Sequence, residues 1–341
     1  MEIHTNIPLK NLTTMKLGGP AKYVIEAFKI EDIIEACQKS KSENLPIFVI
    51  GDGSNVIAND NGFNGIIIRI RINGFEIIAD DLNSTTIKIG AGENWDSIVQ
   101  RTVDLRLTGI EAMSAIPGTA GATPVQNVGA YGQEIADTLI SLEAYDILNN
   151  KMISLQNSDC DFKYRQSIFN TNALGKYIIT SITLRLSKNL PTTPFYSSLQ
   201  KYLDEKNIHI YNHEIIRNAV IEIRKTKLPD PKVFANCGSF FKNVIVDDWK
   251  LNELRKNYPD IMAFDMGDKK FKIPTGWLIT KAGLKGQSFN GMKVFENNSL
   301  VLINESANSY NDLIAARDQI ADKIRDTFQI QIEQEPIEIK S

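Results

Sequence analysis

The stretch AIPGTAGATPVQNVGAYG, residues 115–132, decides how the rest of this chain is interpreted. It holds four glycines and two prolines, and the wider segment 112–133 carries no charged side chain. A membrane span is excluded because Pro117 and Pro124 break a helix and several residues of the run are polar. Glycines let a backbone approach a ligand closely, so its N–H groups can hold phosphates without lysines. The stretch predicts either a cradle for the pyrophosphate and ring edge of a large cofactor or a glycine-rich surface loop.

A second glycine-rich turn, GDGSNV at residues 51–56, follows the short apolar run 45–50, which is typical of a buried strand. The turn does not match the dinucleotide fingerprint G-x-G-x-x-G, because Val56 takes the last position and residues 59–62 are helix breakers. Two lysine-poor, glycine-rich loops therefore predict one shared cofactor site that is not of the Rossmann kind.

Strands and helices alternate around these loops. A strand, a helix, a second strand, the glycine-rich turn and a third strand form an α/β unit of nucleotide-binding size. Apolar periodicity predicts strands at 21–27, 45–50, 66–70, 85–90, 139–148, 178–186, 300–303 and 330–335, and helices starting near 30, at 95 after the N-cap Asn94, at 215–227 and at 313–328. Turn-forming and helix-breaking residues at 73–74 and 228–231 form two composition breaks, where domain boundaries are expected.

Composition narrows the class of protein. The 341 residues suggest roughly two to three domains. A net charge of −3 gives no electrostatic reason to expect nucleic acid or an anionic membrane as partner. No secretory leader is recognisable, and the distant cysteines Cys37, Cys160 and Cys237 indicate a reducing cytoplasm without disulfides or a thiolate metal site. His209 and His213 have the i,i+4 spacing but lack the glutamate of a zinc helix, so no metal site is expected.

In chain order, the motifs resemble the UDP-N-acetylenolpyruvoylglucosamine reductases, flavoenzymes that make UDP-N-acetylmuramic acid for bacterial peptidoglycan. The resemblance runs from residue 11 to residue 335, and the length and the segment 194–199 are similar to the longer, type I form of the family. The motifs are an interrupted NTT…LGGPA, GDGSNVI, GAGENW, IPGTAGATPVQNVGAYG, FKYRQSIF, TKLPDPKV, NCGSFFKN, GWLI, LKG, LVLINE and an acidic C-terminal strand.

The resemblance implies an α+β fold with three parts. Two subdomains would bind FAD, as in flavoproteins of the vanillyl-alcohol-oxidase (PCMH) type, and a C-terminal α/β domain would bind substrate. The expected ranges are 1–74 together with 331–341 for the first subdomain, 75–227 for the second, and 228–330 for the substrate domain. The composition breaks fall at the same places.

The resemblance also implies the reaction. NADPH would reduce FAD, and the flavin N5 hydride would then add to the terminal carbon of the enolpyruvyl C=C in a UDP-sugar. Negative charge would build on the α-carbon beside the substrate carboxylate, and a proton must reach that carbon. Such a site needs cations where charge develops and one positioned acid. A cytoplasmic monomer is expected.

Three residues are expected to carry the chemistry. Arg165 matches the family's carboxylate-binding arginine, because a guanidinium fits a carboxylate bidentately. Ser239 matches the proton donor. Glu335 matches the acidic residue near the carboxylate and is preferred over Glu333, although the local EQEP departs from the more usual EPEV. A carboxylate in that place should hold a proton or pair with Arg165.

The resemblance carries over two further sets of residues. Tyr196 is the loosest match of the substrate set, because PFYSSL departs from the usual pattern, and Lys227 could instead be a helix C-terminal cation. Substrate binding, chiefly of the diphosphate, is expected at Tyr196, Lys227, Asn243 and Lys285. FAD binding is expected at Gly51, Gly53, Ser54, Asn55, Pro117, Gly118, Thr119, Gly121, Ala122, Thr123, Gln126, Asn127, Gly129, Ala130 and Tyr131.

Two other functions are compatible with the same fold. The first is an FAD-dependent oxidase of a sugar or hydroxy acid, although no histidine lies in a motif suited to covalent flavin attachment and an oxidase would not use Ser239 as proton donor. The second is a nucleotide-binding regulatory or scaffold protein that has lost catalysis. The presence of Arg165, Ser239 and Glu335 argues against it.

Overall fold

The computed structural model describes residues 1–340, so residue 341 of the expected first subdomain lies outside the described residues. The N-terminal sheet contains β2 (Pro20–Ala27), β5 (Phe63–Ile70) and β3 (Ile47–Ile50) in parallel, with β1 (Glu2–Pro8) antiparallel on the edge beside β2. Helix α1 (Ile30–Glu43) connects β2 to β3, as the periodicity predicted. The isoleucines of β5 are almost completely buried, which explains its unbroken apolar sequence.

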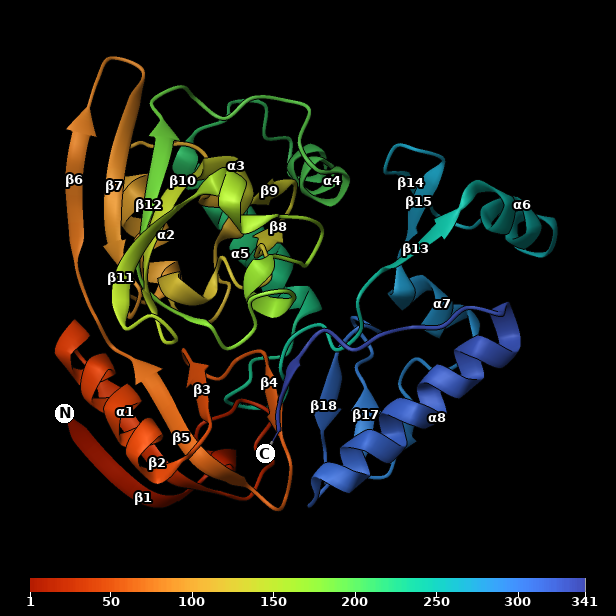
Figure 1. The fold of residues 1–341 in the computed structure, drawn as a ribbon. Helices are drawn as coiled ribbons and strands as arrows, with labels where there is room; N and C mark the ends of the chain where they lie inside the picture. Colours follow the sequence, from red (N-terminus) through yellow and green to blue (C-terminus); the bar gives the residue numbers. More distant parts are fainter. Residues whose placement is uncertain (341) are drawn as a thin grey trace.

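The central sheet has five antiparallel strands in the order β11-β10-β12-β7-β6 and stands above the N-terminal sheet in Figure 1. Its strands are β6 (Phe75–Asp80), β7 (Ser84–Gly90), β10 (Leu139–Asp146), β11 (Lys151–Gln156) and β12 (Tyr177–Ser187). The same part of the chain contains α2 (Trp95–Asp104), α3 (Ile135–Thr138), α4 (Ser197–Glu205), α5 (His213–Lys227) and the small hairpin β8 (Gly129–Ala130) and β9 (Gln133–Glu134). The expected N-cap is confirmed, because Asn94 accepts from the backbone N–H of Ser97 at 3.0 Å.

The C-terminal lobe, residues 244–328, extends to the right in Figure 1. It has two three-stranded sheets, β13-β15-β14 and β16-β17-β18. Its elements are β13 (Val244–Asp247), α6 (Asp248–Asn257), β14 (Phe264–Asp265), β15 (Lys270–Ile273), α7 (Thr275–Lys281), β16 (Ser288–Phe289), β17 (Met292–Val294), β18 (Leu302–Asn304) and α8 (Tyr310–Phe328). Short 3-10 turns lie at Leu9–Asn11, Glu111–Met113, Ala120–Ala122, Asn157–Cys160 and Ile168–Asn170.

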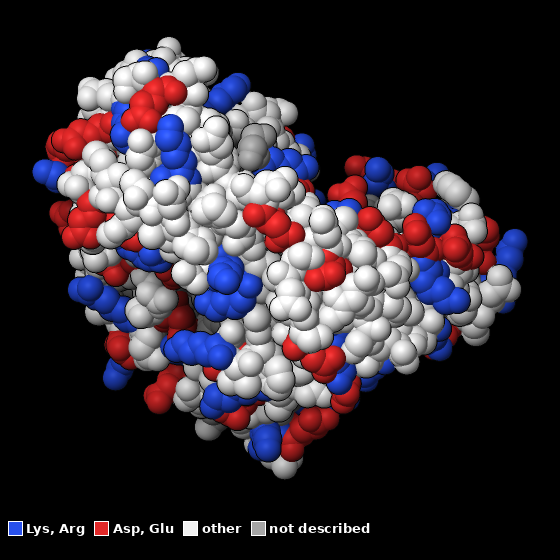
Figure 2. Space-filling model, turned by 90° about the horizontal axis from the view of Figure 1, so that it is seen from below, with Lys and Arg blue, Asp and Glu red and all other residues white. Residues whose placement is uncertain are grey.

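Two large cores hold these parts together. One runs continuously from the N-terminal sheet into the central sheet. The other fills the C-terminal lobe and also takes in Met15, Leu17 and Ile57 from the N-terminal part of the chain. Figure 2 shows the lobe diverging from the rest of the molecule across a notch, with acidic and basic side chains intermingled on this face. No helix among residues 1–340 is long and apolar enough to cross a membrane.

The strand predicted at 330–335 is wrong. The segment makes only an isolated bridge between Gln334 and Phe241, and the C-terminal strand is β19 (Ile337–Ile339), parallel to β4 (Val56–Ala58). The alternation that suggested a strand arises because Ile330 and Ile332 insert into the core of the C-terminal lobe. The N-terminal residues, for which no strand was predicted, form the exposed edge strand β1.

Candidate active site

The two glycine-rich loops meet, as their shared lack of lysine predicted. The hydroxyl of Ser54 donates to the carbonyl oxygen of Pro117 at 3.2 Å, and the amide of Asn55 donates to Gln126 Oε1 at 2.7 Å. Gln126 in turn donates to the backbone carbonyl of Glu335 at 2.9 Å. Residues far apart in sequence therefore enclose one site.

The first loop keeps its backbone donors available. The N–H groups of Gly53, Ser54 and Asn55 donate to no acceptor within residues 1–340. Gly53 has φ +68°, and a Cβ there would lie 1.9 Å from the carbonyl oxygen of Leu12. Only glycine fits, and the free N–H groups suit the oxygens of a pyrophosphate.

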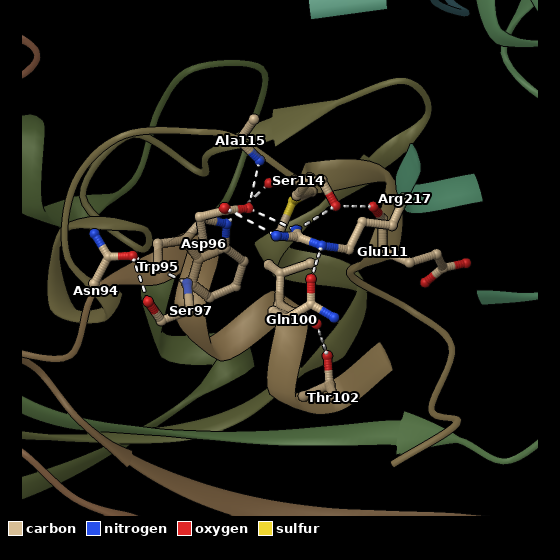
Figure 3. A network of polar contacts seen from close by, with 12 residues as sticks. Asn94, Trp95, Asp96, Ser97, Gln100, Thr102, Glu111, Ser114, Ala115 and Arg217 are labelled. Carbon is tan, nitrogen blue, oxygen red and sulfur yellow. Dashed lines mark hydrogen bonds and ion pairs between the residues drawn. The ribbon is translucent and has the colours of Figure 1, made fainter. Parts of the chain in front are cut away.

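The second loop starts at Ala115, whose backbone conformation is strained and is fixed by a hydrogen bond. Ala115 has φ +59°, which is unfavourable for a residue with a Cβ. Its N–H donates to Asp96 Oδ1 at 2.6 Å. Arg217 of α5 donates to both oxygens of the same carboxylate, from Nη1 to Oδ1 at 2.6 Å and from Nη2 to Oδ2 at 3.0 Å. Arg217 also donates to Ser114 Oγ and Gln100 Oε1, as Figure 3 shows. This network fixes α5, α2 and the entry to the loop against one another.

Two adjoining cavities of about 370 Å³ and 260 Å³ lie between the loops. Their combined volume is in the size range of small-molecule sites. The first is largely apolar, and its walls come from β3, the chain around residues 174–179 and β19. Residues that line both cavities include Phe48, Gly51, Thr119 and Ala122. One elongated ligand can therefore extend through both.

Most of the predicted cofactor residues line the second cavity, and Gly121 lines only the first. The set in the second cavity is Gly51, Gly53, Ser54, Asn55, Pro117, Gly118, Thr119, Ala122, Thr123, Gln126, Gly129 and Ala130. Asn127 lines neither cavity, because its side-chain amide is hydrogen-bonded within the protein. It donates to the carbonyl of Lys163 and accepts from the N–H of Ala136. Tyr131 also lines neither, and its ring packs edge-on against Tyr196 at a centroid distance of 6.2 Å.

Arg165, Ser239 and Glu335 all line the second cavity. Arg165 Nε lies 3.1 Å from Glu335 Oε1, and Arg165 Nη2 donates to the carbonyl of Gly129 at 3.1 Å. The segments that carry Ser239 and Glu335 run side by side, since the N–H of Glu335 donates to the carbonyl of Phe240 at 2.8 Å. The structure thus brings the three residues together from three regions of the chain.

The electrostatics distinguish Glu335 from its neighbour Glu333. Burial raises the pKa of Glu335 above its usual range although Arg165 opposes this shift. The side chain of Glu335 is 14% exposed, whereas that of Glu333 is 75% exposed and pairs with Lys242 at 3.6 Å outside the cavity. A carboxyl that holds its proton more readily than an exposed glutamate therefore faces the cavity at position 335.

Cys237 also lines the cavity, two residues before Ser239. Burial raises the pKa of its thiol. The thiol form is a weak nucleophile, so Cys237 has no place in covalent chemistry here.

The four predicted substrate residues lie outside both cavities. Tyr196 precedes α4 and is 42% exposed, and Lys227 is the last residue of α5, directly before the cavity residue Leu228. Asn243 Oδ1 accepts from the N–H of Thr275 at 3.1 Å. Lys285 is exposed in the turn after α7. The structure does not bring these four into mutual contact.

Sequence reasoning missed Arg224, whose side chain lines the second cavity from α5. The helical period gave a signal, because Arg224 lies two turns after the buried Arg217 and one turn after the buried Val220 of this amphipathic helix, and is itself half-buried. It also missed Lys272 of β15, whose ammonium lies 5.0 Å from the ring centroid of Tyr164, beside Arg165.

Comparison with known proteins gives consistent results along the chain. Residues 21–155 match the FAD binding domain family, and residues 230–339 match the C-terminal domain of UDP-N-acetylenolpyruvoylglucosamine reductase. The UDP-N-acetylenolpyruvoylglucosamine reductase of Flavobacterium johnsoniae is 36% identical over 336 residues, 98% of this chain and 99% of the relative. That of Aliivibrio fischeri is 36% identical over 335 residues, 98% of this chain and 94% of the relative.

The crystal structure of the reductase from Thermus caldophilus superposes with a TM-score of 0.68. It is 20% identical and covers 99% of this chain and 98% of its own. Together with the FAD binding domain match, this confirms the expected α+β fold class.

Proposed function

The chain belongs to the UDP-N-acetylenolpyruvoylglucosamine reductase family, and on this premise we propose that it uses bound FAD and NADPH to reduce UDP-N-acetylenolpyruvoylglucosamine to UDP-N-acetylmuramate, a precursor of peptidoglycan. The observation that carries the proposal is the meeting of Arg165, Ser239 and Glu335 in the cavity that the two glycine-rich loops line. Each group suits one requirement of the reaction.

The cavities suit FAD. The free N–H groups of residues 53–55 and the approach of the second loop fit its pyrophosphate, and the adjoining apolar cavity offers room for the adenosine end. When bound, FAD would supply hydride transfer from NADPH to the terminal carbon of the substrate C=C. The protein's own residues bind and orient the substrate and manage the charge and the proton.

Arg165 binds the substrate carboxylate and stabilises the negative charge that spreads into it when the α-carbon becomes electron-rich. A guanidinium held at a fixed position in a buried site does this without reorganisation. Glu335 lies against Arg165 at 3.1 Å and holds that arginine in place in the free enzyme. Because burial raises its pKa, Glu335 can carry a proton beside the substrate carboxylate instead of repelling it.

Ser239 gives its hydroxyl proton to the α-carbon. A hydroxyl is a weak acid, so the transfer requires a strongly basic carbon and cations nearby to stabilise the resulting alkoxide. Arg165 supplies such a charge in the same cavity.

The UDP part of the substrate would contact Tyr196, Lys227, Asn243 and Lys285 once the C-terminal lobe and the central part enclose it. That none of the four lines a cavity is in keeping with the notch between the lobe and the rest of the molecule (Figure 2). We propose the three-part division 1–74 with the C-terminal residues, 75–227 and 228–330, because each contains its own sheet. A cytoplasmic monomer with access to NADPH completes the proposal.

The test is an anaerobic absorbance experiment on the purified protein reconstituted with FAD. NADPH is expected to bleach the flavin, and one equivalent of UDP-N-acetylenolpyruvoylglucosamine is expected to restore the colour without oxygen. A protein that takes up no FAD contradicts the proposal. Recovery of colour by air alone, with no response to the substrate, would indicate an oxidase instead.

A further inference from the structure

The first glycine-rich loop carries a carboxylate where the proposed ligand is an anion. Asp52 directly precedes the free N–H groups of residues 53–55 and lines the second cavity with them. The pyrophosphate of FAD carries two negative charges, which an unpaired carboxylate beside the loop would repel. An aspartate also tends to accept from the N–H two residues on, here that of Ser54, and would then occupy a donor that the pyrophosphate needs.

The structure places this carboxylate against an arginine instead. Arg71 Nη1 donates to Asp52 Oδ1 at 2.9 Å, and Arg71 Nε donates to Glu26 Oε2 at 3.0 Å. Arg71 directly follows β5, and its backbone N–H donates to the carbonyl of Ala27, the last residue of β2, at 2.8 Å. The guanidinium therefore bridges the N-terminal sheet and the first loop from a fixed position.

The charges beside this bridge alternate in sign. Arg69 of β5 pairs with Oε1 of Glu26, the oxygen that Arg71 does not contact. Asp52 is the last member of the row. Within residues 1–340, Arg71 is the only ion-pair partner of Asp52, so the charge that the loop presents depends on this arginine.

The backbone of the loop is fixed by other contacts. The carbonyl of Gly53 accepts from the N–H of Thr14 at 3.1 Å, and the hydroxyl of Ser54 donates to the carbonyl of Pro117 at 3.2 Å. Neither contact involves Arg71. Removing Arg71 should therefore release the Asp52 side chain while the loop keeps its path.

Resting on the proposed function, we propose that Arg71 is a positioning residue for the cofactor. It holds the Asp52 carboxylate away from the N–H groups of residues 53–55 and cancels its charge, and so keeps the first loop open to the pyrophosphate of FAD. Asp52 is 35% exposed, so solvent weakens the repulsion that follows the loss of Arg71. We expect an effect of about 10-fold on FAD affinity instead of complete loss.

The test is a titration of the FAD-free protein with FAD in low-salt buffer, followed by the change in flavin fluorescence. Arg71→Gln is expected to raise the Kd of FAD about 10-fold. Adding Asp52→Ala to that variant is expected to restore the Kd to within about 3-fold of the wild type, since it removes both the charge and the competing acceptor. Arg69→Gln is the matched control, because it breaks the other ion pair of Glu26 and leaves that between Arg71 and Asp52 in place. It should change the Kd by less than about 2-fold.

An Arg71→Gln Kd equal to that of the wild type would overturn the proposal. So would a loss of affinity that the double variant does not recover, because Arg71 would then act on the shape of the loop and not through Asp52. Should Arg71→Gln fail to fold, Asp52→Ala alone decides. It should bind FAD at least as tightly as the wild type, whereas weaker binding would make Asp52 itself a contact of the cofactor and overturn the proposal. These comparisons start from a wild type that binds FAD, so their failure is distinct from that of the proposed function, in which the wild type takes up no FAD.

Discussion

Replacing Arg217 by Met tests whether the network around Asp96 organises the site. The change keeps an unbranched side chain of similar length but removes bonds to Asp96, Gln100 and Ser114. The Asp96 carboxylate then keeps the hydrogen bond from the backbone N–H of Ala115 but loses its ion pair, while remaining partly buried. Breaking a buried pair by deleting one member costs about 3 to 5 kcal/mol. Because the side chain of Asp96 is 35% exposed and can be hydrated, we expect a loss below that range, about 2 to 3 kcal/mol.

The assay is urea unfolding of the FAD-free protein at neutral pH. With a slope of about 3 kcal/mol per M, the midpoint should fall by about 0.7 to 1 M without a change in slope. Arg325→Met on α8 is the control, because that arginine is 51% exposed and pairs with exposed Asp322 at 2.7 Å. It should cost less than about 0.5 kcal/mol. A similarly small loss for Arg217→Met would mean that the Arg217–Asp96 pair does not hold these elements together.

The cost should depend on pH. Burial raises the pKa of Asp96, but bonds from Arg217 and the Ala115 N–H outweigh it and leave the folded-state pKa lowered. A lowered pKa contributes stability that is present above the unfolded value near about 3.9 and is lost as pH falls through the folded value. The difference between Arg217→Met and wild type should therefore be largest at neutral pH and shrink below about pH 4.

Three further predictions follow from the site. Gly53→Ala should abolish FAD binding in a flavin titration and cost about 3 kcal/mol in chemical unfolding, because its Cβ would meet a backbone oxygen. Gly175→Ala, at φ +71° but with open space around its Cβ, should cost about 1 kcal/mol of stability in the same unfolding measurement. The cysteine thiols are buried, so a thiol reagent at about pH 8 should label the native protein far more slowly than the unfolded one, and fast labelling would contradict that burial. Glu335→Gln should slow flavin reoxidation by substrate at least about 100-fold while reduction by NADPH is retained in stopped-flow traces, and an equal effect on both would remove Glu335 from the substrate step.

Much of this arrangement could be predicted because it depends on local patterns. Apolar runs located most strands, Asn94 marked the start of α2, and two lysine-poor loops indicated a common site. β19 could not be predicted, because its three residues become a strand only by pairing with β4.

Side-chain pairing across the fold was equally inaccessible. The helical period places Arg224 on the same side of α5 as the buried Arg217, yet nothing local says that Arg217 meets Asp96 and Arg224 lines a cavity. Such assignments depend on how α5 docks against α2 and the loop at residues 115–132.

Whether Ser239 is the proton donor is tested by comparing the two half-reactions of the Ser239→Ala protein by anaerobic stopped-flow absorbance. Ser239 lies in the cavity with Arg165 and Glu335, and its proposed role is to protonate the substrate carbon, a step that has no counterpart in the reaction with NADPH. We predict that NADPH reduces the flavin of the variant at nearly the wild-type rate, while reoxidation by UDP-N-acetylenolpyruvoylglucosamine is slower by about 10³-fold or more. Equal slowing of both half-reactions, or an unchanged rate with substrate, would contradict it.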